Sequence, residues 1–337
     1  MNTTSTPVRD LRVNEKFSIK KLLTSWEMIL LYILAFLNVA LMFLETDIYF
    51  SSGTIPFVIR SGMVVSFMVL GMTFVLLLGC IDVSVASIMI VSCMVMGLVS
   101  RQGASDFLTV LCGILAGAIC GAFNGVLVAK FKMPSVIVTI ATSMLFRGIA
   151  DIILNGEALD TFPKWFAVLS WHDLGGVIPY SMICFLVIAV ILGFILSKTK
   201  FGRMVYVIGN AETTAKYSSV RVDLVKIAVF TLMGVTAALS GILFAGRLGG
   251  ITSGMGKGYE LQVIAIAVLG GVSTNGGKGK IYGPVIATFI MAFLNKTLDL
   301  IGVHANIQKI ITGVILLIVV MIPAFEKIIK RKGSVSK

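Results

Sequence analysis

The sequence predicts an all-α polytopic membrane protein, and two observations carry this prediction. Of the 337 residues, 57% are hydrophobic and only 13% are charged, whereas a soluble domain has about 25% charged residues. The hydrophobic residues also gather in long runs, and about 20 apolar residues are enough to cross a bilayer as one helix. Short polar segments separate these runs, so we expect no appended soluble domain.

Taken in chain order, the apolar runs give about ten predicted spans. They are 26–44, 55–78, 83–100, 107–129, 134–154, 179–196, 226–246, 259–273, 282–301 and 306–325. The eighth run is short and bounded by glycines, so a partial span is the alternative there. The first run has no A-x-A cleavage site after it, so we expect a membrane helix and not a cleaved signal.

The distribution of basic residues predicts that both termini are cytoplasmic. Roughly 20 of the 28 Lys and Arg residues fall in segments on one side of this arrangement, and basic loops stay on the cytoplasmic side. We therefore expect cytoplasmic tails at 1–25 and 326–337 around a membrane domain at 26–325. The net charge of +12 comes from basic residues that lie mostly at the ends of apolar runs. We therefore interpret it as a sign of membrane topology and not of nucleic-acid binding. The outer loop 155–178 is expected to hold a short surface helix.

The residue types that carry enzyme chemistry form no recognisable site. The five cysteines lie in or beside apolar runs, where they behave as small buried hydrophobes, and the two histidines lack metal-ligand spacing. The segment GGVSTNGGKGKIYGP (270–284) fails as a phosphate loop, because Gly277-Lys278 is followed by Gly279 where Ser or Thr is required. We expect no metal, no cofactor and no ATP hydrolysis by this chain, and we interpret 270–284 as a glycine-rich inner turn.

The longest basic polar interval, 197–226, is predicted to be a cytoplasmic element with structure of its own. Gly209-Asn210 is a turn signal, and 211–220 can follow as a short amphipathic helix whose start Asn210 caps. This helix is a candidate handle for an intracellular partner; the alternative is a solvated basic loop. The expected contact residues of the handle are Gly209, Asn210, Ala211, Ala215 and Tyr217.

Two of the predicted spans carry small residues at regular helical spacing. The first stripe is Gly113, Gly117, Gly121 and Gly125, and the second is Gly234, Ala238, Gly241 and Ala245. Bare stripes of this kind let two helix backbones approach closely. We therefore interpret them as packing surfaces and not as ligand contacts.

Polar side chains inside the spans need partners or water. Gly79 can break a helix, and Asp82 and Ser84 can then cap the next one; the alternative for Asp82 is a place beside a transport path. The pathway candidates are Asp82, Ser84, Asn124 and Thr139.

Among the other charged residues within the spans, three have an expected role. Arg147 and Asp151 are four residues apart, so they can pair on one helix. Arg60 is expected to snorkel to the outer surface. No long row of embedded carboxylates is present of the kind that proton-driven carriers often use.

Four segments together carry a family resemblance: GCIDVSVASI (79–88), GAFNGVLVAKFKMPSVIVTIATSMLFRGIA (121–150), FGRMVYVIGNAETTAKYSSVRV (201–222) and GYELQVIAIAVLGGVSTNGGKGKIYGPVIA (258–287). In order and spacing, over nearly the whole chain, they resemble the permease subunits of bacterial ABC importers for monosaccharides, the ribose, xylose, rhamnose and autoinducer-2 group. IDVSVASI and TFPKWFA (161–167) look closest to the rhamnose type, with the autoinducer-2 type next.

The resemblance implies a multi-pass permease subunit of the inner membrane that pairs with a second copy or a paralogue, with the pathway between them. It also implies two copies of a separate ATPase subunit, docked at 197–226, and a periplasmic or lipid-anchored sugar-binding protein outside. Arg101, Arg247 and Lys257 are candidates to dock that protein, unless they are simply solvent-exposed. The rival functions are an ion-gradient-driven secondary carrier and a structural membrane scaffold.

Overall fold

The computed structural model describes residues 25–44, 53–218, 220–304, 306–318 and 321. Residues 1–24 of the predicted tail 1–25, the predicted tail 326–337 and the end of the last predicted span lie outside these residues. Each predicted span overlaps a helix. These helices are α2 (Trp26–Leu44), α4 (Thr54–Leu77), α5 (Val85–Arg101), α6 (Asp106–Ala129), α7 (Ser135–Leu154), α9 (Tyr180–Lys198), α12 (Val222–Leu248), α13 (Tyr259–Leu269), α14 (Tyr282–Leu300) and an unlabelled helix at Asn306–Ile318.

Five of the described helices are long and apolar enough to cross a membrane: α4, α6, α7, α9 and α12. Helix α13 has only 11 residues, and a span needs about 20, which agrees with a partial span at this place. The structure therefore confirms a helical polytopic membrane protein, while the count of ten spans and the cytoplasmic position of the termini stay predictions.

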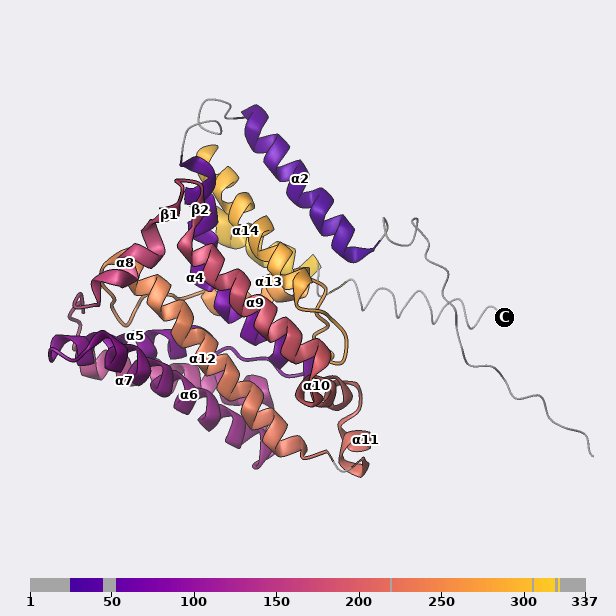
Figure 1. Ribbon diagram of the computed structural model, residues 1–337. Coiled ribbons are helices and arrows are strands. Elements are labelled where there is room, and N and C mark those ends of the chain that lie inside the picture. Colours follow the sequence, from indigo (N-terminus) through magenta and orange to yellow (C-terminus); the bar gives the residue numbers. More distant parts are fainter. Residues whose placement is uncertain (1–24, 45–52, 219, 305, 319–320, 322–337) are drawn as a thin grey trace, which may run out of the picture.

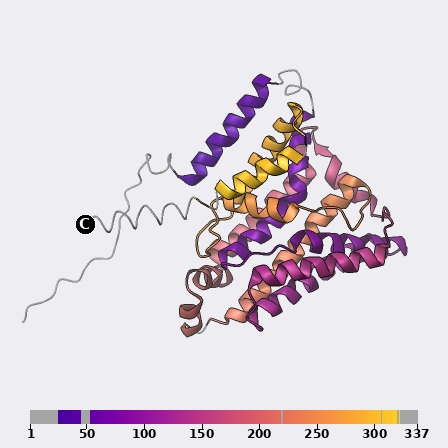
Figure 2. The same ribbon diagram turned by 180° about the vertical axis from the view of Figure 1, so that it is seen from behind.

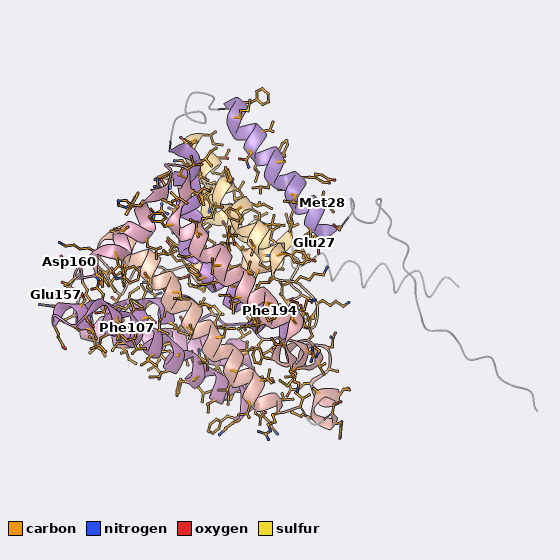
Figure 3. The ribbon with its side chains drawn as sticks, viewed as in Figure 1. Glu27, Met28, Phe107, Glu157, Asp160 and Phe194 are labelled. Atoms are coloured by element: carbon orange, nitrogen blue, oxygen red, sulfur yellow. The ribbon has the colours of Figure 1, made fainter. Side chains whose placement is uncertain are left out.

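Helices α4 and α12 form the centre of the bundle. Within their most apolar windows, 78% and 67% of the residues are buried, against 28% for α6, α7 and α9. Figures 1 and 2 show α5, α6 and α7 on one side of α12, and α14 with α2 beyond α4 on the other. The outer helices keep large apolar side chains exposed, such as Phe107 and Phe194 (Figure 3), as expected where lipid or another subunit covers them.

The glycine stripes are packing surfaces, as predicted. A Cβ atom on Gly117 would lie 2.5 Å from the carbonyl oxygen of Gly234, and one on Gly121 would overlap the carbonyl oxygen of Phe230. Helices α6 and α12 therefore cross with their backbones in contact, which only residues without a side chain permit. This crossing fixes the position of α6 and of the polar side chains on it.

Loops that were predicted to share one side of the membrane contact one another. At one end of the bundle, Leu159 pairs with Ile251 through backbone hydrogen bonds, and Glu157 and Asp160 lie there (Figure 3). At the other end, the amide of Gly277 donates to the carbonyl of Leu77 (2.9 Å). The outer loop holds the expected short helix, α8 (Lys164–Trp171), followed by the strands β1 (Asp173–Leu174) and β2 (Ile178–Pro179).

Two of the predicted roles for charged side chains were wrong. Arg60 does not snorkel freely to the surface: its guanidinium pairs with Asp173 at 2.9 Å, and both side chains are 14% exposed. Arg147 does not pair with Asp151. It donates instead to the carbonyls of Ser253 and Met255, because the 249–258 segment folds over α7 and offers acceptors that sequence spacing does not reveal.

Candidate functional site

The basic interval 197–226 forms two short helices, α10 (Lys200–Asn210) and α11 (Glu212–Tyr217). The helix predicted over 211–220 is present as α11 but is shorter, since it begins at Glu212 and ends at Tyr217, and α10 was not predicted. Residues 200–210 are helical because Val205 and Ile208 recur at helical spacing and are buried, and Thr199 caps the start by accepting a hydrogen bond from the amide of Gly202 (3.2 Å). The structured element on this side is therefore larger than expected (Figure 1).

Gly209 and Asn210 close α10 and form no turn before a single helix. Asn210 does not cap α11, which begins after Ala211 without a side-chain cap. The side-chain nitrogen of Asn210 instead donates to the carbonyls of Tyr206 (2.9 Å) and Gly277 (3.5 Å). Gly209 is required for close approach, because a Cβ there would overlap the carbonyl oxygen of Leu77 and lie 2.6 Å from the amide of Gly277.

Helix α11 presents one large side chain outward and holds another residue inside. Tyr217 is 92% exposed, so it is free to meet a partner, and Ala211 is exposed as well. Ala215 is fully buried within this chain. The expectation that Ala215 contacts a partner was therefore wrong, because its methyl group already packs beneath α11.

Glu212 ties α11 to α12. Its carboxylate pairs with Lys216 (2.8 Å) and with Lys226 (2.7 Å) at the start of α12. Burial of the carboxyl raises its pKa, but the hydrogen bonds from the two lysines outweigh burial, so the pKa of Glu212 lies below its ordinary value. The same contact raises the pKa of Lys216. The carboxyl group of Glu212 is therefore ionised at neutral pH.

Three glycine-bearing segments meet where α10 ends. We call this contact the glycine junction, and it consists of Gly79, Gly209 and Gly276-Gly277. Gly79 follows α4 with a left-handed φ of 74°, which confirms the predicted helix break. A Cβ on Gly276 would lie 2.7 Å from the carbonyl oxygen of Gly209 and 2.8 Å from the amide of Gly79. Since all these atoms are backbone, displacement of α10 must displace the break between α4 and α5.

A buried polar cluster follows directly after this break. One carboxylate oxygen of Asp82, Oδ1, accepts hydrogen bonds from the amide (2.8 Å) and the hydroxyl (2.6 Å) of Ser84. The side-chain nitrogen of Asn124, on α6, donates to that hydroxyl (2.8 Å). Thr139, on α7, accepts from the amide of Val83 (3.1 Å). The four pathway candidates thus lie in one place, although 57 positions separate Asp82 from Thr139 in the chain.

All four side chains of this cluster are fully buried. They hold the irregular segment 79–84 against α6 and α7, so the structure favours the helix-break interpretation over direct exposure to a pathway. Ser84 precedes α5 but makes no side-chain cap bond. Asp82 Oδ2 and Asn124 Oδ1 have no hydrogen-bond partner among the described residues, which leaves two acceptors without donors.

Sequence reasoning missed Ser135, whose hydroxyl accepts a hydrogen bond from the amide of Ile81 (3.1 Å). Its place directly after Pro134 at a helix start was the available signal, since such residues often bond nearby backbone groups. The three docking candidates differ in accessibility. Arg101 and Lys257 are exposed, whereas Arg247 is half-buried and donates to the carbonyl of Arg60 (3.2 Å), so it is already engaged within the chain.

Comparisons with known proteins agree with the expected family. The chain is 33% identical over 269 residues to the autoinducer 2 import system permease protein LsrC of Yersinia pseudotuberculosis, covering 80% of this chain and 76% of the relative. It is 33% identical over 273 residues to LsrC of Escherichia coli, covering 81% and 80%. It is 31% identical over 277 residues to the ribose import permease protein RbsC of E. coli K12, covering 81% and 86%. The expected rhamnose-type likeness stays a prediction.

No solved structure matches the chain. A family model described as the permease component of the branched-chain amino acid transport system matches residues 54–320. This range contains the glycine junction, the polar cluster and α10–α11, and it takes in most of the described helices. The chain therefore belongs to this family of transport-system permeases, which are multi-pass proteins of the inner membrane.

Proposed function

We propose that this chain is the transmembrane permease subunit of an ABC importer for a monosaccharide or a sugar-like molecule. Its family membership, with relatives named for import of autoinducer 2 and of ribose, is the observation that carries this proposal. A separate ATPase subunit would supply the energy, a second permease copy or a paralogue would complete the pathway, and an external binding protein would deliver the substrate.

The ATPase docks on α10–α11 in this proposal. Tyr217 is exposed and aromatic, and such residues are enriched at interface hot spots. Glu212 holds α11 to α12 through Lys226, so force on α11 reaches a central helix. Through Gly209, α10 also bears on the backbone of Leu77 and Gly277. Closure of the ATPase would thus move the break at 79–84 and, with it, the polar cluster.

Reconstitution in proteoliposomes with the ATPase and binding protein encoded by neighbouring genes tests this function. The complete system should import sugar in an ATP-dependent manner, and loaded binding protein should stimulate hydrolysis. Tyr217→Ala should lower that stimulation at least several-fold without loss of membrane insertion. Tyr32→Ala is the matched control, because Tyr32 is half exposed on α2, far from α11 (Figure 1).

Two outcomes would overturn the proposal. Uptake by the permease alone under an ion gradient, without any ATPase, would make the chain a secondary carrier. Full stimulation and transport by an assembled Tyr217→Ala complex would instead remove α11 from the coupling contact. A panel of sugars tested on the binding protein identifies the substrate.

A further inference from the structure

An open cleft of about 480 Å³ lies at the end of the bundle that is predicted to face the cytoplasm. It is bounded by the start of α2, by α10, and by the glycine-rich turn between α13 and α14. Glu27, which lines it, lies at the lower end of α2 in Figure 3. Neither the polar cluster nor the exposed side chain of Tyr217 belongs to this cleft.

Hydrogen bonds between distant parts of the chain hold the walls of the cleft. The indole nitrogen of Trp26 donates to the carbonyl of Leu269 (2.9 Å), and the hydroxyl of Tyr206 donates to the carbonyl of Gly279 (2.7 Å). Gly271 has a φ of 84° and lies so close to Trp26 that a Cβ there would be 2.8 Å from the indole ring. The cleft is thus built by packing, and it does not depend on one loop.

The charge of the cleft favours an anion. Lys278 and Lys280 line it, and the only carboxylate among its lining residues is that of Glu27, 3.5 Å from Lys280. Within the described residues Lys278 forms no ion pair, and the backbone amides of residues 278–280 make no hydrogen bond. Successive free amides in a glycine-rich turn form an anion-binding concavity.

The membrane side of the cleft is apolar. Helix α2 begins at the cleft with Trp26, a residue type that gathers at membrane interfaces, and continues with exposed Leu31, Phe36 and Phe43. It packs mainly on α14, at the edge of the bundle (Figure 2). A phosphate group in the cleft would therefore lie at the start of α2, and acyl chains attached to it could pack along the apolar face of that helix.

We propose that this cleft binds the phosphate headgroup of an anionic phospholipid from the cytoplasmic leaflet, with Lys278, Lys280 and the 278–280 amides on the phosphate. Basic clefts between helices on this side of a membrane suit such headgroups. A soluble anion could make the same polar contacts, but it has no acyl chains to pack on the apolar face of α2. The proposal does not depend on the substrate of the transporter.

The test is native mass spectrometry of the purified full chain with phosphatidylglycerol or phosphatidylcholine. The parent protein should retain phosphatidylglycerol in preference to phosphatidylcholine. Lys278→Gln/Lys280→Gln should bind phosphatidylglycerol about 30-fold more weakly, since loss of each of the two lysines should weaken headgroup binding by a similar factor. Lys164→Gln/Lys257→Gln is the matched control, because it removes two exposed lysines from the opposite end. Thermal unfolding of each variant checks the fold.

Each other result overturns the assignment. Equal phosphatidylglycerol binding by the cleft variant and the parent would exclude the two lysines. Displacement of the lipid by millimolar inorganic phosphate would assign the cleft to a free anion. Unchanged lipid binding together with loss of the copurifying ATPase would assign it to a protein partner.

Discussion

The α6–α12 crossing makes a sharp prediction about Gly121. An alanine there would place a methyl group in overlap with the carbonyl oxygen of Phe230 and 3.1 Å from the amide of Gly234. Carbon atoms pack best at about 3.5–4.0 Å, and both neighbours are backbone, so the helices must separate. Overpacking of this kind costs about 1–3 kcal/mol, while the gain in helix propensity from Gly to Ala returns about 1 kcal/mol. We therefore expect Gly121→Ala to destabilise the protein by up to about 2 kcal/mol.

Gly148→Ala is the matched control. Gly148 lies within α7, and a Cβ there would have no neighbour within 4 Å, so this change should leave stability equal or raise it by up to about 1 kcal/mol. Thermal unfolding of both variants in the same detergent, followed by circular dichroism, compares them directly. If Gly121→Ala melts with or above Gly148→Ala, the backbone contact between α6 and α12 does not limit stability and the packing argument fails.

Two further predictions concern the polar cluster and α11. Asp82→Asn keeps an acceptor for Ser84 and should preserve folding and uptake, whereas Asp82→Leu leaves buried donors unpaired and should cost about 1–3 kcal/mol; equal unfolding temperatures for the two variants would argue against the cluster. The pKa of Glu212 is lowered. The stability that its ion pairs give to α11 is therefore complete above the ordinary pKa of 4.5 and is lost as pH falls through the lowered pKa. Limited proteolysis near α11 should therefore accelerate only in acid, and Glu212→Gln should be cleaved quickly at every pH; a flat profile in the parent would contradict this assignment.

Family, class and helix positions could be predicted from the sequence because they depend on local properties. Hydropathy is summed along a run, so every predicted span overlapped a helix. Glycine spacing identified the α6–α12 surface, because small residues four apart lie on one helix face whatever the partner. Gly79 could be recognised as a break for the same local reason. The motifs that carry the family resemblance are likewise contiguous segments.

The tertiary structure decided which distant groups meet. Arg60 was expected to reach the surface, yet Asp173 supplies its partner from another loop. Ala215 looked available to a partner, but α11 folds back and buries it.

The same holds for the glycine turn, whose pattern indicated no phosphate loop and did not reveal a basic cleft. The lysines of that turn acquire their setting from Trp26 and Tyr206, which lie far away in the sequence. The sequence by itself thus determined the class of the protein and the places of its helices, because these follow from local periodicity and charge. Only the tertiary structure decided which side chains are partnered, buried or free, because those properties depend on contacts that exist only once the helices pack.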